Sequence, residues 1–163
     1  MYKFNEEQKF RQWWVGILMT GFAFVPLYGI YQQLIMGEPF GDKPMSNLVL
    51  FLFSFLTFGI ITLFYSIQLK TEINKFELRF AFLPFYRRSI KWEDVESAKV
   101  ISYVVLGYGV KFGSKYGTVF NIAGNKGLAI KLKNGKKLLI GTQKHIELSE
   151  AVKGILNEQS IEN

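Results

Sequence analysis

The chain has 163 residues, a formal charge of +7, no cysteine and one histidine. This length accommodates one small soluble domain beside a membrane segment and excludes a second one. The lack of cysteine excludes disulfides, thiolate metal sites and thiol nucleophiles, and one histidine excludes a histidine metal cluster. The first 69 residues carry equal numbers of acidic and basic side chains, so the excess positive charge belongs to the remainder.

Two uncharged apolar runs, residues 13–35 and 48–69, dominate the first half of the chain. At about 1.5 Å per residue, each helix would reach roughly 33 Å, enough for a hydrocarbon core of about 30 Å. We therefore predict two transmembrane helices joined by the turn-rich loop 36–47. A cleaved signal peptide fits the first run less well because the run is too long for a signal core. Neither run contains an ionisable side chain, which favours an anchor over an ion path.

The charges that flank the two runs predict their orientation. The loop between the runs has Lys43 as its one basic residue, whereas the outer flanks hold Lys3, Lys9, Arg11, Lys70, Lys75, Arg79, Arg87 and Arg88. Because basic residues accumulate on the cytoplasmic side, both termini are expected in the cytoplasm. The expected localisation is a multi-pass protein of the cytoplasmic membrane.

After residue 69 the pattern changes to short segments of alternating polar and apolar residues, which is typical of an antiparallel sheet. The predicted strands are Thr71–Lys75, Glu77–Leu83, Arg87–Trp92, Glu96–Tyr103, Gly109–Phe112, Thr118–Ile122, Leu128–Lys133 and Lys137–Gly141. Between the last two strands, Asn134 and Gly135 predict a type I′ turn, which needs two positive φ angles.

The chain is predicted to end in a helix with Thr142 as its N-cap. Its buried stripe is expected to consist of Leu148, Ala151, Val152 and Ile155. The predicted fold is thus an α+β membrane protein: an N-terminal segment and transmembrane hairpin over residues 1–69, then a cytoplasmic domain over residues 70–163. The order of elements in that domain favours a pleckstrin-homology-like antiparallel β split barrel with a C-terminal helix.

Several segments also carry a resemblance to a known family. They are Thr71–Ile73, Leu78–Arg88, Ile90–Val95, Gly124–Gly127 and Asn134–Lys144. Together they resemble bacterial two-span membrane proteins of unknown function that carry a bacterial pleckstrin-homology-like domain. The resemblance implies the fold, the topology and a bacterial inner membrane, and it carries over no catalytic residue or ligand. His145 departs from the proline expected at that position.

Basic side chains are the principal binding candidates. They are Lys70, Lys75, Arg79, Arg87, Arg88 and Lys91. Anionic headgroups or an acidic partner would be attracted to them, at about 1 kcal/mol per charge near a membrane surface. The bias of basic residues toward the cytoplasmic side explains the same residues without any ligand, and both interpretations stay open. A specific inositide pocket is not predicted, because the first strands offer only Lys75 and Arg79.

Other site classes have weaker support. Lys131, Lys133, Lys136 and Lys137 would suit nucleic acid, but the aromatic residues for stacking crowd a different hairpin. Glu93, Asp94 and Glu96 would suit a cation, but acids in such a turn more often cap it and contact solvent. The glycine pairs between residues 107 and 127 precede no helix, so they are not read as a phosphate loop.

These observations favour a non-enzymatic, membrane-anchored binding or scaffold module that recognises a protein partner, a second copy of itself or the anionic membrane surface. No cofactor, metal, small-molecule substrate or nucleic acid is expected. The alternative from another class is a small enzyme that acts on lipid through Asp94 or His145. Nucleic-acid binding through residues 131–137 is the third hypothesis.

Overall fold

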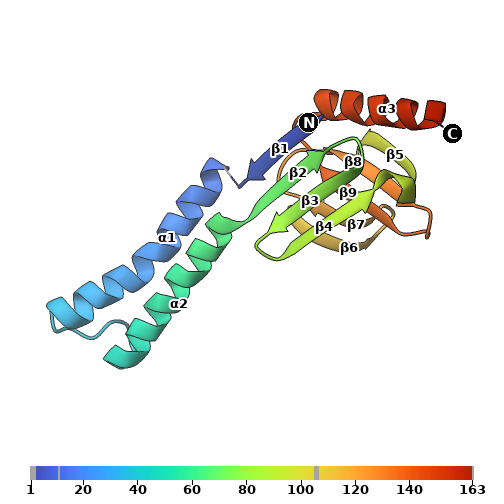
Figure 1. The fold of residues 1–163 in the computed structure, drawn as a ribbon. Coiled ribbons are helices and arrows are strands. Elements are labelled where there is room, and N and C mark those ends of the chain that lie inside the picture. Colours follow the sequence, from blue (N-terminus) through green and yellow to red (C-terminus); the bar gives the residue numbers. More distant parts are fainter. Residues whose placement is uncertain (1–2, 11, 105–106, 163) are drawn as a thin grey trace. The chain divides into compact units, whose positions relative to one another are not determined.

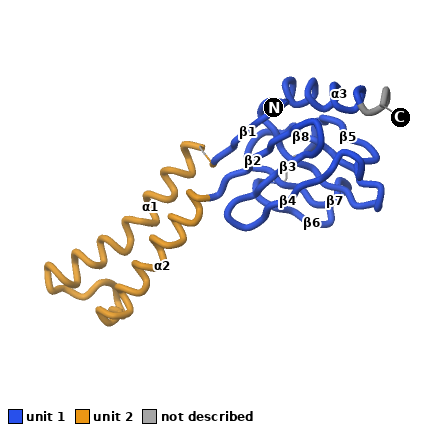
Figure 2. The backbone as a smooth tube through the Cα atoms, viewed as in Figure 1, with its two compact units in different colours: residues 1–9, 67–163 blue, residues 10–66 orange. Residues whose placement is uncertain are grey.

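The computed structural model of the chain describes residues 3–10, 12–104 and 107–162. The chain forms two compact units (Figure 2). The helical unit is Phe10–Ser66, and the sheet unit combines Met1–Lys9 with Ile67–Asn163. The sheet unit is therefore built from two separate stretches of sequence. Of the flanking charges used to predict orientation, Arg11 lies outside the described residues.

The helical unit contains the two predicted apolar helices. Helix α1 spans Trp13–Ile30 and continues as a π-helical turn, η1, over Tyr31–Ile35, while α2 spans Asn47–Ser66. Both are long and apolar enough to cross a membrane, and only 17% and 11% of their most apolar windows are buried. The core helix of a soluble protein would be mostly buried, which these two helices are not. Helix α2 ends at Ser66, before the predicted limit, because the chain turns into a strand at Gln68.

Five serine and threonine side chains of these helices find partners within their own helix. The hydroxyls of Thr20, Ser54, Thr57, Thr62 and Ser66 each donate to the carbonyl four residues earlier, at 2.7–2.8 Å. Such bonds give each of these five hydroxyls a partner in an apolar surrounding. These side chains are therefore compatible with hydrocarbon.

The sheet unit contains two sheets (Figure 1). Sheet A has the order β1-β2-β3-β4, with β1 Phe4–Lys9, β2 Gln68–Ile73, β3 Glu77–Leu83 and β4 Tyr86–Lys91. Sheet B has the order β5-β8-β9-β7-β6, with β5 Val95–Ser102, β6 Gly109–Ser114, β7 Gly117–Asn121, β8 Lys126–Leu132 and β9 Lys137–Gly141. A short 3-10 helix, η2 over Trp92–Asp94, links the sheets. All eight predicted strands are present, and the described strands form no closed barrel.

The prediction of a purely antiparallel sheet is wrong at one pair. Strands β7 and β9 are parallel, with Thr118 opposite Leu138 and Phe120 opposite Ile140. The reason is that β9 returns between β7 and β8, although β7 and β8 follow one another along the chain. The short connection between β7 and β8 looks like an ordinary hairpin loop in the sequence.

Strand β1 was not predicted. It pairs antiparallel with β2, from Phe4 opposite Ile73 to Lys9 opposite Gln68. Its inward side chains, Phe4, Glu6 and Gln8, are buried. The expected division grouped residues 1–69 together, whereas in the structure residues 1–9 belong to the sheet unit. Two of the three inward side chains are polar, so the strand has no apolar alternation to reveal it.

The loop between β8 and β9 differs from the predicted type I′ turn. Gly135 has φ +81°, and no described residue other than glycine has a positive φ. The Leu132 N–H donates to the Lys136 carbonyl and the Gly135 N–H to the Leu132 carbonyl, both at 2.9 Å. This is a three-residue loop in which glycine alone takes the left-handed conformation.

The C-terminal helix α3 spans His145–Glu162. Thr142 is not its N-cap: the Lys144 carbonyl accepts the first helical bond, from Leu148, and the Thr142 hydroxyl accepts from the Lys144 N–H at 3.1 Å. The predicted stripe of Leu148, Ala151, Val152 and Ile155 is buried.

Helix α3 packs against β5, β1 and β8 (Figure 1). Strand β1 is one edge of sheet A and β5 is one edge of sheet B. The helix therefore covers the side of the sheet unit where these two edges lie. The other two edge strands, β4 and β6, lie on the opposite side, which the helix does not cover.

Candidate functional site

Four of the six predicted binding residues line one groove of about 530 Å³ on sheet A. We call it the basic groove; its lining consists of Lys70, Glu72, Arg79, Phe80, Ala81, Leu83, Arg87, Arg88 and Ser89. The strand register explains the arrangement, because Ala81 of β3 lies opposite Lys70 of β2 and opposite Arg87 of β4. A small side chain between two cations leaves the groove open at its centre.

Two of the four cations already have carboxylate partners. Lys70 lies 3.0 Å from Glu7, which also contacts Lys9 at 2.9 Å. Hydrogen bonds from Lys9 and Lys70 lower the pKa of Glu7. Arg79 forms an ion pair with Glu77. The pKa of Glu77 is lowered by hydrogen bonds from Ser89 and Arg79.

Arg87 and Arg88 differ from these two cations. Neither forms an ion pair with any residue that the structure describes. They are neighbours on β4, the edge strand of sheet A. Their side chains therefore carry the unneutralised charge of the basic groove.

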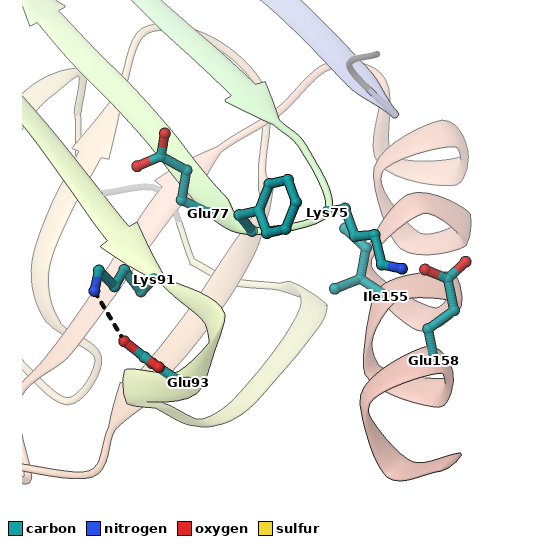
Figure 3. A pocket seen from close by; sticks show the side chains of 7 residues that line it. Lys75, Glu77, Lys91, Glu93, Ile155 and Glu158 are labelled. Atoms are coloured by element: carbon teal, nitrogen blue, oxygen red, sulfur yellow. Dashed lines mark hydrogen bonds and ion pairs between the residues drawn. The ribbon is translucent and has the colours of Figure 1, made fainter. Parts of the chain in front are cut away.

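The remaining two predicted residues, Lys75 and Lys91, line a different pocket of about 460 Å³ (Figure 3). Its other lining residues are Phe76, Glu77, Glu93, Ile155 and Glu158. Lys91 lies 3.0 Å from Glu93, which raises the lysine pKa. Lys75 and Glu158 point toward one another from the β2–β3 loop and α3. Three carboxylates outnumber the two lysines here, so this pocket does not favour an anion.

A third cavity, of about 550 Å³, was not predicted from the sequence. We call it the seam groove, because Tyr86 and Arg88 of edge strand β4 and Val110 and Phe112 of edge strand β6 line it together. It lies on the side of the sheet unit that holds the β4 and β6 edges.

Aromatic rings form the floor of the seam groove. Tyr86 stacks on Phe120 with ring centroids 5.3 Å apart and planes at 19°, and Phe80 lies 5.0 Å from Phe120. Phe85 and Phe112, at the rim, are 62% and 79% exposed. The β3–β4 hairpin shows its aromatic residues in the sequence, but Phe112 and Phe120 reach the same cavity from sheet B. No local pattern connects them.

Three cations, Arg88, Lys136 and Lys137, also line the seam groove, and no carboxylate does so among the described residues. From the sequence, the lysines around residue 135 are expected away from the aromatic hairpin. The structure brings Lys136 and Lys137 to the same cavity as Phe80, Phe85 and Tyr86. Neither lysine has an ion-pair partner in the described part of the chain.

The residues of the enzyme hypothesis do not converge. The Asp94 carbonyl accepts from the Lys133 N–H just beyond the end of β8, at 2.9 Å. His145 begins α3 close to Thr142, whose N–H donates to Lys126 at the start of β8. Asp94 and His145 thus lie at opposite ends of one strand and cannot share a substrate atom.

Two of the three acidic residues considered for a cation site form ion pairs with lysines instead. Glu93 pairs with Lys91 at 3.0 Å, and Glu96 pairs with Lys131 at 2.5 Å. Within residues 3–10, 12–104 and 107–162, no group of three or more histidine, aspartate or glutamate side chains is arranged to hold a metal ion.

Comparison with known proteins gives no relative: no family model, no curated protein and no solved structure matches the chain. The functional assignment therefore depends on the geometry of the two grooves.

Proposed function

We propose that the chain is a membrane-anchored, non-enzymatic binding module, in which a pleckstrin-homology-like sheet unit places its basic groove against anionic headgroups of the membrane that its helices cross. The observation that carries this proposal is the pair Arg87 and Arg88, which line the groove without an ion-pair partner among the described residues. Lys70 and Arg79 line the same surface, each beside its own carboxylate partner.

Few residues separate the basic groove from the second helix along the chain. Lys70 follows Ser66, the last residue of α2, by four positions. At roughly 3.3 Å per extended residue, four residues span at most about 13 Å. Attraction to a charged leaflet extends over a Debye length of about 8 Å from the surface, and long basic side chains bridge the difference.

Strand pairing also supports a hairpin with both ends on one side. Strand β1 precedes α1 and strand β2 follows α2, yet the two strands form one antiparallel ladder. A bilayer cannot divide a hydrogen-bonded sheet, so the residues before and after the helices share a side. The charge bias of the flanks favours the cytoplasm as that side.

A nitroxide in the basic groove tests the headgroup contact. The chain has no cysteine, so Ala81→Cys gives one labelling site in the full-length protein. The labelled protein is placed in phosphatidylcholine nanodiscs with increasing phosphatidylglycerol. We expect collisions of the nitroxide with a water-soluble nickel complex to decrease as the anionic lipid increases, because headgroups cover the groove.

Charge variants identify the residues responsible. Arg87→Gln/Arg88→Gln should abolish the response to phosphatidylglycerol. Lys99→Gln/Lys153→Gln removes the same charge from exposed positions on β5 and α3, and should preserve the response. If the collision rate of the labelled protein without charge substitutions does not change with the phosphatidylglycerol content, the proposed contact is disproved.

A further inference from the structure

We propose that the seam groove binds an extended acidic segment of a partner protein. The segment would place a large apolar side chain on the aromatic floor and carboxylates beside Arg88, Lys136 and Lys137. Phe80 and Arg88 line both grooves, whereas Lys136 and Lys137 line the seam groove and not the basic groove, so variants of these two lysines test this interaction separately from the headgroup contact.

The two sides of the sheet unit differ: a helix covers one of them, and the other has free strand edges. Helix α3 packs along the edges β1 and β5. On the other side, the edges β4 and β6 flank the seam groove, and no described strand pairs with their free backbone groups. Free strand edges bind extended peptides readily, since the peptide supplies the missing backbone hydrogen bonds.

The side chains of the groove fit an acidic peptide with an apolar centre. Phe80, Tyr86 and Phe120 form a preassembled aromatic floor, and a buried apolar anchor on such a floor supplies most of the affinity of a small interface. Three cations without a lining carboxylate favour negative charge on the occupant. The volume of about 550 Å³ lies within the usual range of roughly 300–1,000 Å³ for binding pockets.

A peptide fits these features better than a lipid does. An acyl chain would fill the aromatic floor but cannot pair with the backbone of β4 or β6. The cations also come from both sheets, Arg88 from sheet A and Lys137 from sheet B. They therefore suit several carboxylates along a peptide rather than one headgroup.

The test uses the full-length protein in nanodiscs of phosphatidylcholine alone, so that anionic lipid does not compete. The probes are three fluorescent heptapeptides with the same Val-Phe-Val centre: Asp-Glu-Val-Phe-Val-Glu-Asp, Ser-Asn-Val-Phe-Val-Asn-Ser and Lys-Arg-Val-Phe-Val-Arg-Lys. Anisotropy should show the acidic peptide binding at least tenfold more tightly than the neutral one, and no binding of the basic one.

Matched variants locate the binding site. Lys136→Gln/Lys137→Gln should weaken the acidic peptide about tenfold, and Phe112→Ser should weaken all binding without unfolding because Phe112 is 79% exposed. Lys99→Gln/Lys153→Gln should leave the affinity unchanged. Hydrogen exchange should slow at amides of β4 or β6 when the acidic peptide is bound, as strand addition requires.

Three outcomes would overturn the proposal. In the first, the protein does not prefer the acidic peptide or binds none of the peptides. In the second, the control variant Lys99→Gln/Lys153→Gln weakens binding as much as Lys136→Gln/Lys137→Gln. In the third, hydrogen exchange of the β4 and β6 amides is the same with and without the acidic peptide. Competition by oleate together with unprotected edges would assign the groove to a lipid chain instead. None of these outcomes affects the nitroxide experiment on the basic groove, so the two proposals fail separately.

Discussion

The Glu6 carboxylate of the first strand accepts a hydrogen bond from the Thr142 hydroxyl at 2.5 Å, just before the last helix. Its second oxygen accepts from the Gln143 N–H at 2.8 Å. Glu6 is 4% exposed and Thr142 is 2% exposed, so water does not compete for these bonds. These hydrogen bonds connect strand β1 to the residues that immediately precede α3.

We expect Glu6→Ala to lower the free energy of unfolding of the sheet unit by about 2–4 kcal/mol, because the buried Thr142 hydroxyl and the part-buried Gln143 N–H both lose their acceptor. Urea unfolding of the full-length protein in nanodiscs, followed by the fluorescence of buried Trp92, measures this loss. Hydrogen exchange should accelerate at the Gln143 amide in particular. Glu7→Gln on the exposed face of the same strand is the control and should change much less.

A second prediction concerns Gly117 at the start of β7. Its φ is +76°, and a Cβ there would lie 2.0 Å from the Lys137 carbonyl oxygen of β9. Gly117→Ala should therefore force the parallel pair β7–β9 apart. We expect a loss of about 1–2 kcal/mol from the left-handed conformation and a further 1–3 kcal/mol from the clash.

Gly113 separates these two contributions. It has φ +70° in the same hairpin, but a Cβ there meets nothing within 4 Å. Gly113→Ala should show the conformational loss alone, again in urea unfolding. Equal destabilisation by both variants would mean that the approach to Lys137 is not what requires glycine at position 117.

The sequence predicts those elements whose signal is local. The apolar runs, the alternating strands and the stripe of α3 can each be seen within a dozen residues. Strand β1 cannot, because Glu6 and Gln8 point inward and their partners, Thr142 and Gly141, lie more than a hundred residues away. The seam groove is missed for the same reason, since Tyr86 and Phe120 meet only when the two sheets pack.

A third prediction concerns Tyr103, whose buried hydroxyl has no hydrogen-bond partner among the described residues. Burial, with a smaller contribution from Tyr108, raises the pKa of Tyr103 to about 12. In the unfolded chain it ionises near its ordinary value of 10.0, so stability should fall as the pH rises from 10 toward 12.

Tyr103→Phe should remove that alkaline decrease and the absorbance step near pH 12. At neutral pH it should leave stability unchanged or slightly higher, because an unpaired buried hydroxyl is removed. Ultraviolet absorbance titration and urea unfolding measure the two effects. A clear loss of stability at neutral pH would show that the hydroxyl has a partner after all.

A fourth prediction concerns acid. Ion pairs with lysines lower the pKa values of Glu7 and Glu158 below 4.5 in the folded protein, and a hydrogen bond from Ser89 together with the ion pair to Arg79 lowers that of Glu77. Each pair therefore stabilises the fold above pH 4.5, and this contribution is lost as the pH falls through the lowered pKa. The urea midpoint should decrease below about pH 4.5, and high salt should flatten this dependence because the side chains are exposed. A midpoint that is independent of salt would point to buried groups instead.

The last prediction follows from the pairing of Lys9 with Gln68. Since these residues are opposite one another at the ends of β1 and β2, a tight Asn-Gly turn can replace residues 10–67. We expect this variant to be soluble and to keep the slow hydrogen exchange of the Gln143 amide. Residues 67–163 alone lack Phe4, Glu6 and Gln8 and expose the edge of β2, so they should unfold at lower urea or aggregate. If both variants unfold at the same urea concentration, β1 is not an integral strand of the sheet unit.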